Sequence, residues 1–255
     1  MKSGLVYLIT MAGRGLRFGT AGYELPKYMI EASGATLFEH SLGSLPLSAA
    51  DRIVFVALKE HQEKYALKTF IASKLEKLCG GAAPEMKILL LEKPTGGQAQ
   101  TALAAQSLVP DGCELAIYNI DTRFSSATLA RRLADPALKK DGVIGAFKLT
   151  GVDPKWSFAL TAADDTVLRT AEKEQISDNA LTGFYHFTSA RDFFRVAEAA
   201  VKNNLTERGE FYVAPLYNQL IREGRSFVLD TAESLLPLGT PEDLRSYVLD
   251  AKPDA

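Results

Sequence analysis

The chain has 255 residues, of which 47% are hydrophobic and 24% charged, as in folded globular domains and unlike disordered chains. Its formal charge of −2 predicts no nucleic-acid partner and no membrane-binding patch. Two distant cysteines, Cys79 and Cys113, without Cys or His partners at metal spacing, argue against a zinc site and a disulfide framework. The apolar run 5–9 is too short for a signal-peptide core or a membrane span. We therefore expect a soluble cytoplasmic protein.

Short apolar runs alternate with helical patterns through the first half of the chain. The pattern predicts strands at 5–10, 52–58, 86–91 and 114–120, and helices at 36–45, 60–78 and 99–108. This alternation implies parallel strands joined by crossover helices, hence an α/β fold with a doubly wound, Rossmann-like sheet.

The second half has a more mixed pattern. It predicts strands at 143–149, 157–161, 167–170, 181–187 and 226–230, and helices at 191–202 and 212–222. No linker, repeat or low-complexity tract separates the two parts. We therefore expect a single domain, 1–255, in which residues from about 136 to 255 add a small mixed-sheet lobe to residues from about 1 to 135.

A glycine-rich loop, Met11 to Gly19, follows the first predicted strand. Such a loop lets backbone amides approach a phosphate chain, and the carboxyl end of a strand is where open α/β sheets bind ligands. A dinucleotide-binding loop would read G-x-G-x-x-G and lead straight into a helix. Here Arg14 fills the middle of the first G-x-G and Gly-Tyr-Glu-Leu-Pro-Lys follows, so neither that fingerprint nor the P-loop fits. By itself, a plain glycine turn with solvated arginines is an equal interpretation.

Lys27 favours a functional interpretation of the loop. It follows a proline and stands ten residues after Arg17. The pattern M-A-G-x-G-x-R-F followed by P-K resembles the signature of the sugar nucleotidyltransferases, the sugar-1-phosphate pyrophosphorylases. In that family the loop wraps a nucleoside triphosphate, and the arginine and lysine bind its phosphates. Arg14 stands where the family often has glycine, so its role stays open. The matching residues are Ala12, Gly13, Gly15, Arg17 and Lys27.

Two more stretches of the first half resemble the same family. Gly97-Gln98-Ala99-Gln100-Thr101 is similar to its G-x-A-x-A, where small residues at a helix start let the nucleoside lie against the backbone. Asn119-Ile120-Asp121 is similar to its strand-end G-D, and a strand-end carboxylate suits Mg²⁺. Each has an ordinary alternative: an alanine-rich helix start, and an aspartate that caps a helix near residue 125. The resemblance implies nucleotide binding at Gly97 and Gln98, and catalysis and magnesium binding at Asp121.

In the second half, Glu172-Lys173, followed by Gly183 in Gly-Phe-Tyr-His-Phe, resembles the family's E-K and G-x-Y-x-F. There the Glu and Lys contact the sugar phosphate, and the glycine lets the sugar approach its strand. The resemblance therefore implies acceptor binding at Glu172, Lys173 and Gly183. A solvated charge pair is the alternative for the first two residues, and we interpret His186 as an ordinary strand residue.

Residues 238–244, Leu-Gly-Thr-Pro-Glu-Asp-Leu, are close to the family's G-T-P-E-D-L. Thr240 as N-cap, proline at the first position and acids in the first turn predict a helix start. The family often has a second magnesium-binding aspartate one or two residues before the glycine, where this chain has Leu238 and Pro237. Asp230 is the best remaining candidate for a second carboxylate.

The resemblance runs from about residue 5 to about residue 249. It implies a GT-A-type fold, with a nucleotide-binding first half and an acceptor-binding second half. It also implies Mg²⁺-dependent transfer from a nucleoside triphosphate to a phosphorylated small molecule, such as a sugar 1-phosphate, with release of pyrophosphate. Residues 209–218 resemble a less characterised bacterial branch, which identifies neither base nor acceptor. The oligomeric state is not readable from the sequence.

Two other functions remain open at this stage. A glycosyltransferase that uses a nucleotide sugar would normally carry D-x-D after a strand, and Asn119-Ile120-Asp121 is a partial version. The pairing of Arg17 with Lys27 favours a free triphosphate over a nucleotide sugar. The missing second aspartate leaves room for a nucleotide-binding regulator without activity.

Overall fold

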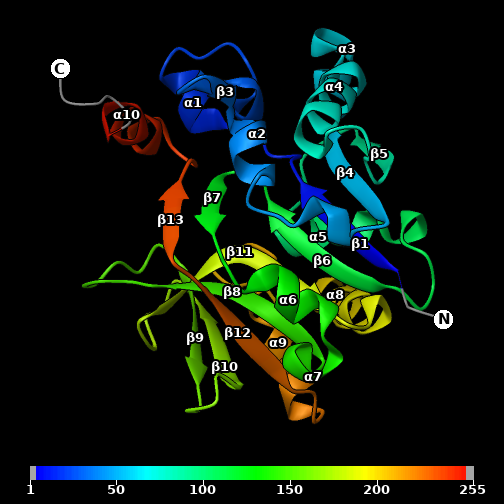
Figure 1. Ribbon diagram of the computed structural model, residues 1–255, viewed down its shortest axis with the longest axis vertical. Helices are drawn as coiled ribbons and strands as arrows, with labels where there is room; N and C mark the ends of the chain where they lie inside the picture. The colour runs from blue at the N-terminus through cyan, green and yellow to red at the C-terminus, as the bar shows by residue number, and fades with distance from the viewer. Residues whose placement is uncertain (1–3, 251–255) are drawn as a thin grey trace.

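A nine-stranded sheet forms the centre of the computed structural model, which describes residues 4–250 and the side chains of residues 4–247 (Figure 1). Four neighbouring strands of the first half run parallel. Their order is β5 (Glu85–Leu91), β4 (Arg52–Leu58), β1 (Leu5–Thr10) and β6 (Glu114–Asn119). The predicted doubly wound sheet is confirmed, because parallel neighbours of this kind require crossover connections.

The sheet changes character at β11 (Asn179–Phe187), which is antiparallel to β6. On its other side β11 pairs antiparallel with β8 (Gly142–Lys148), and β12 (Phe227–Ala232) pairs parallel with β8. The strands β9 (Ser157–Thr161) and β10 (Val167–Glu172) form an antiparallel arm beside β11. Strand β11 therefore joins the parallel half to the mixed lobe that the sequence predicts.

Helices cover both faces of the sheet, and β1 alternates between the two cores that they form. Val6 and Leu8 belong to one core, and Tyr7 and Ile9 to the other. This period of two is what a strand buried on both faces requires. The first core contains residues of α5 (Gln98–Ala104), α8 (Ala190–Lys202) and α9 (Leu216–Arg222), and the second contains residues of α2 (Leu37–Leu42), α4 (Leu67–Cys79) and α6 (Leu129–Ala134).

Three helical predictions were wrong in detail. The single helix expected at 60–78 is divided into α3 (Lys59–Tyr65) and α4 by Ala66, whose φ of 49° no α-helix accommodates. The helix expected from residue 212 begins at Leu216, after Pro215, because proline restricts the conformation of the residue before it. The glycine loop is followed by a short helix, α1 (Leu16–Thr20), and not by irregular chain alone.

The remaining elements are short apart from the last helix. They are β2 (Glu31–Ala32), β3 (Ala35–Thr36), β7 (Thr122–Ser125), α7 (Pro136–Lys139), β13 (Ser234–Pro237), α10 (Pro241–Asp250), and 3₁₀ turns at Lys27–Met29, Leu47–Ala49 and Gln106–Leu108. The predicted start of α10 is confirmed: Thr240 Oγ1 accepts from Asp243 N at 3.1 Å, and Asp243 Oδ2 accepts from Thr240 N at 2.9 Å. No helix among residues 4–250 has the length and apolar character to cross a membrane.

A buried carboxylate fixes α4 against α2. Glu39 is 6% exposed and completes a capping box with Thr36 at the start of α2. Two lysines of α4 donate to it, Lys74 at 2.9 Å and Lys77 at 2.7 Å. Burial opposes the charge on Glu39, but the lysines and Thr36 outweigh it and lower the pKa of this carboxyl far below its usual range.

Candidate active site

A pocket of about 600 Å³ opens where β1 and β6 end, and both halves of the chain line it. Nine of the eleven site residues predicted from the sequence line this pocket, and the other two line a pocket that adjoins it. Those that line it directly are Ala12, Gly13, Lys27, Gly97, Gln98, Asp121, Glu172, Lys173 and Gly183. Gly15 and Arg17 line an adjoining pocket of about 500 Å³, which shares Lys27 and Pro94 with the first. The structure therefore gathers residues that lie up to 171 positions apart in the sequence.

The glycine loop leaves β1 next to the end of β6, because Thr10 and Asn119 are partners in the parallel register. Gly15, the N-cap of α1, has a φ of 61°, a conformation that glycine adopts without strain. Gly13 has an ordinary φ, and a Cβ there would meet nothing within 4 Å. A side chain at Gly13 would therefore fit the protein but reduce the space left for a ligand in the pocket.

Lys27 and Asp121 form an ion pair in the pocket, with 2.6 Å between Nζ and Oδ2. Their side chains are 17% and 28% exposed, so water screens the pair only partly. Burial opposes the charge on Asp121, but the Lys27 ammonium and the Asn119 amide outweigh it and lower the pKa of this carboxyl. Asp121 is therefore ionised near neutral pH.

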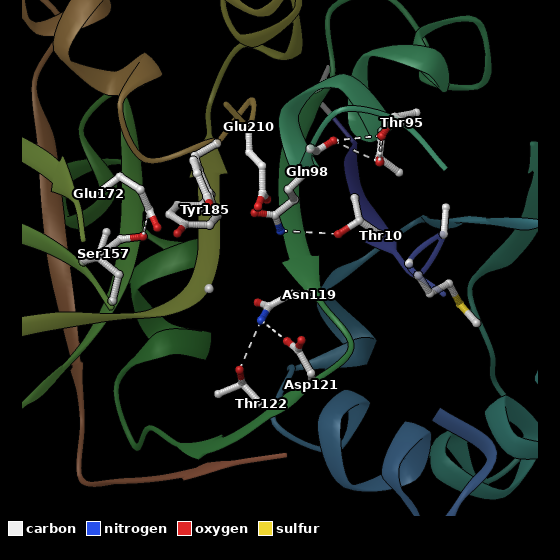
Figure 2. A pocket seen from close by; sticks show the side chains of 18 of the residues that line it. Thr10, Thr95, Gln98, Asn119, Asp121, Thr122, Ser157, Glu172, Tyr185 and Glu210 are labelled. Carbon is white, nitrogen blue, oxygen red and sulfur yellow. Dashed lines mark hydrogen bonds between the residues drawn. The ribbon is translucent and has the colours of Figure 1, made fainter. Parts of the chain in front are cut away.

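Asn119 supports Asp121 from the end of β6 (Figure 2). Its Nδ2 donates to Asp121 Oδ1 and, at 3.1 Å, to Thr122 Oγ1. Its Oδ1 is buried and has no hydrogen-bond partner among the described residues. Gly183 faces this oxygen with a φ of 87°, and a Cβ at that position would lie 1.7 Å from Asn119 Oδ1. Only glycine therefore fits at position 183 of β11, against the Asn119 amide that holds Asp121.

The loop before α5 is shaped by a segment of the other half, residues 207–213, which we name the strap. Phe211 N donates to Gly96 O, and Phe211 O accepts from Ala99 N, both at 2.9 Å. Between these bonds a Cβ on Gly97 would lie 2.5 Å from both Phe211 N and Phe211 O. The strap thus requires glycine at 97, and Gln98 then reaches Thr10, with Nε2 donating to Oγ1 at 3.3 Å.

The far end of the pocket is lined by acids, lysines and aromatic rings of the second half. Figure 2 shows Glu172, Tyr185 and Glu210 on this side. Lys173 has a φ of 53°, and its Nζ donates to Tyr212 OH and lies 4.8 Å from that ring's centroid. Glu172 accepts a hydrogen bond from the Ser157 hydroxyl. Burial raises the pKa of Glu172, Ser157 and Lys173 act against that rise, and the nearby Glu210 adds to it. The strap therefore also holds the lysine expected to bind the acceptor.

Asp230 does not complete a metal site, which corrects the sequence-based candidate. It is 1% exposed, does not line the pocket, and accepts from Ser126 Oγ at 2.5 Å and Thr128 Oγ1 at 2.6 Å. Arg132 Nε lies 3.2 Å from its Oδ1, so this carboxylate fastens the start of α6 to β12. Both carboxylate oxygens of Asp230 therefore already have partners within the protein.

The position of the family's second aspartate does lie beside Asp121. Leu238 N donates to Asp121 O at 2.8 Å, and a Cβ on Gly239 would be 3.6 Å from Asp121 Oδ2. Leu238 itself is fully buried in a small apolar cluster. The described part of the chain contains no group of three His, Cys, Asp or Glu residues that could hold a metal ion.

A search of solved structures decides the family. The nucleoside-diphosphate-sugar pyrophosphorylase from Vibrio cholerae RC9 is 32% identical, with 95% of this chain and 99% of that chain covered and a TM-score of 0.78. The chain belongs to the nucleoside-diphosphate-sugar pyrophosphorylase family. The resemblance stated from the sequence motifs is confirmed, and neither a glycosyltransferase nor a non-enzymatic regulator is favoured.

More distant structures share the fold of this pyrophosphorylase family. A putative glucose-1-phosphate thymidylyltransferase from Bacillus anthracis is 18% identical, covers 98% of this chain and 96% of its own, and has a TM-score of 0.73. The inositol-1-phosphate CTP transferase from T. maritima is 15% identical, covers 98% of each chain, and has a TM-score of 0.71. No protein-family model matches the chain, and no curated protein matches it.

Several residues that line the pocket were not among the site residues predicted from the sequence. Asn119 belongs to the motif at 119–121, in which only Asp121 was given a role. Tyr212 and Glu210 stood inside the stretch 209–218, whose resemblance to a bacterial branch carried no role. Tyr185 is the tyrosine of the G-x-Y-x-F motif, to which no role was given. Thr10, Lys155, Trp156, Ser157 and Thr182 also line the pocket, and no local pattern distinguishes them from ordinary strand and turn residues.

Proposed function

We propose that this protein transfers a nucleotidyl group from a nucleoside triphosphate to a phosphorylated small molecule, a sugar 1-phosphate in the first instance. The products are a nucleoside-diphosphate sugar, or an analogous conjugate, and pyrophosphate. One observation carries the proposal: a single pocket contains the glycine loop, the ion pair between Lys27 and Asp121, and the pair Glu172 and Lys173. Membership of the family supports it.

In the proposed reaction, a phosphate oxygen of the acceptor attacks the α-phosphorus of the triphosphate in line. The new oxygen–phosphorus bond forms as the bond between the α-phosphorus and its bridging oxygen breaks, and pyrophosphate leaves with that oxygen. The attacking oxygen is an anion near neutral pH, so no general base is needed. What the protein supplies is position, and cations that allow two anions to approach.

The two ends of the pocket suit these two anions. At the glycine loop, Lys27 offers a compact cation for the α-phosphate region, and Arg17 a planar guanidinium for the phosphates beyond it. At the other end, Lys173 offers an ammonium for the acceptor phosphate, held in place by Tyr212. Glu172 lies beside it to accept hydrogen bonds from the acceptor's hydroxyl groups.

We assign magnesium binding to Asp121. Asp121 is an ionised carboxylate in the pocket, and Mg²⁺ is commonly held by one or two carboxylates together with substrate phosphates and water. The donor set therefore fits an ion that arrives with the nucleotide. When bound, such an ion would neutralise charge on the phosphates. Lys27 donates to Asp121 Oδ2 in the structure, so its ammonium would be able to turn toward the phosphates if that oxygen held the ion.

The proposal includes a cytoplasmic location and a single domain with about residues 1–135 on the nucleotide side and about residues 136–255 on the acceptor side. Both cysteines are free in the structure, as a reducing compartment requires. Strand β11 and the strap both join the two sides, which supports one domain.

A matrix of UTP, CTP, GTP, ATP and dTTP against acceptor phosphates, scored by pyrophosphate release with Mg²⁺, tests the proposal. The acceptors should include hexose 1-phosphates, inositol 1-phosphate and phosphocholine. We expect one combination to release pyrophosphate in proportion to conjugate formed, and Lys27→Met to abolish that release. Transfer from a nucleotide sugar without pyrophosphate would indicate a glycosyltransferase. Triphosphate binding without turnover for any acceptor would indicate a regulator.

A further inference from the structure

Arg14 is the residue of the glycine loop that the family resemblance leaves without a role. It lies in the loop between β1 and α1, and its Nε is 3.5 Å from Glu60 Oε1 in α3. Both side chains are more than half exposed, at 54% and 55%. An exposed ion pair of this length contributes little to stability, so Arg14 is free to exchange its partner.

Arg14 also lines the smaller pocket that adjoins the main one, which we name the annex. Three cationic side chains line the annex: Arg14, Arg17 and Lys27. None of the described residues that line it carries a carboxylate. The side chain of Arg17 makes no hydrogen bond or ion pair with any residue that the structure describes, so its guanidinium is available to a ligand. Three convergent cations without a lining acid select a polyanion.

The position of Lys27 says which part of the substrate enters the annex. Lys27 lines both the annex and the main pocket, so it marks the passage between them. The main pocket contains Gly97 and Gln98 on one side and Glu172 and Lys173 on the other, the groups proposed for the nucleoside and the acceptor. What remains of the triphosphate, its β- and γ-phosphates, therefore points into the annex.

We propose a role for Arg14 in this reaction: its guanidinium parts from Glu60 and binds the pyrophosphate group in the annex. This rests on the proposed function. A guanidinium forms two parallel, charge-assisted hydrogen bonds with a phosphate group, which are stronger than its single exposed contact with Glu60. Glu60 then pairs with Arg14 when no pyrophosphate is bound and keeps its guanidinium at the edge of the annex. Arg14 contacts the leaving group in this arrangement, so it belongs to the catalytic residues.

Titration calorimetry with inorganic pyrophosphate and Mg²⁺ tests the proposal without knowledge of base or acceptor. We expect Arg14→Gln to bind pyrophosphate about tenfold more weakly than wild type, as loss of a charge-assisted pair predicts. Arg14→Lys should recover part of that affinity. Glu60→Gln is the matched control: it removes the same ion pair from the other side and should bind pyrophosphate at least as tightly as wild type. Nucleoside monophosphates should bind all four proteins within about twofold.

Two outcomes overturn the assignment. If Arg14→Gln binds pyrophosphate as wild type does, Arg14 does not contact it. If Glu60→Gln weakens pyrophosphate binding as much as Arg14→Gln, the ion pair matters for the loop's structure and not as a resting state. Wild-type protein that releases no pyrophosphate from any triphosphate would instead refute the proposed function, so the two failures are distinguishable.

Discussion

Substitution of Gly183 by alanine tests the contact on which the position of Asp121 depends. Alanine at a φ of 87° costs about 1–2 kcal/mol of conformational energy. In addition, its Cβ would lie 1.7 Å from Asn119 Oδ1, so the amide must turn away. That movement breaks the hydrogen bonds to Asp121 and Thr122, each worth about 0.5–1.5 kcal/mol. We expect Gly183→Ala to lower the free energy of unfolding by about 2–5 kcal/mol.

Gly34→Ala provides the matched control. Gly34 has a φ of 82°, close to that of Gly183, but a Cβ there meets nothing within 4 Å. Its cost should therefore be limited to about 1–2 kcal/mol, with no effect on turnover. The difference between the two variants isolates the contact with Asn119.

Urea unfolding of both variants measures the stability, and pyrophosphate release measures the activity. Gly183→Ala should lose at least about tenfold in turnover, because Asp121 loses the amide that orients its carboxylate. A Gly183→Ala protein as stable as Gly34→Ala, with turnover within about threefold of wild type, would refute the reasoning.

Four further predictions follow from the same structure. Arg17→Ala and Lys27→Ala should each lower turnover by at least about tenfold while far-ultraviolet circular dichroism stays unchanged, and wild-type kinetics in either would remove the loop from the phosphate site. Lys173→Ala should raise the KM for the acceptor more than that for the triphosphate, and the reverse order would exchange the roles of the two ends. Calorimetry should detect Mg²⁺ binding only weakly without triphosphate, since Asp121 is the one protein ligand that we propose; micromolar binding to the free protein would contradict this. The pKa of Glu39 is lowered in the folded protein, so its charge stabilises the fold above the ordinary glutamate pKa, and this stabilisation is lost as the pH falls below that value. Glu39→Gln should therefore flatten the acid side of a plot of unfolding free energy against pH. If the plots of variant and wild type run parallel at acid pH, other groups dominate the acid sensitivity.

The parallel half of the fold was predictable because three of its four strands, β1, β4 and β6, are buried along nearly all of their length. Strands β1 and β4 have the bounds that their apolar runs predict. The short strands β7 and β13 were missed. They pair with each other across more than a hundred residues, and four-residue segments carry no periodicity of their own. The division of the predicted helix at Ala66 could not be predicted either, because alanine has no preference for a positive φ.

The site was predictable to the extent that it consists of local motifs. The glycine loop and Asp121 follow the ends of β1 and β6, which the parallel register brings together, and Lys27 was predicted from the P-K pattern after the loop. Asn119 and Tyr212 were missed because each acts through a partner far away in the sequence, Gly183 and Lys173 respectively. Asp230 was wrongly considered because its distance from the pocket depends on how β12 pairs with β8, which no sequence pattern states.

The strap limits how halves of related proteins can be combined in a chimaera. Phe211 contacts the loop before α5 through its main-chain N and O, so these two bonds do not depend on which side chain stands at position 211. An insertion or deletion of one residue between 207 and 213 would instead shift the two main-chain groups away from their partners. A chimaera that grafts an acceptor half from a relative with another specificity would have to preserve the length of this segment. Its neighbours at 210 and 212, whose side chains line the pocket, are then the positions to vary.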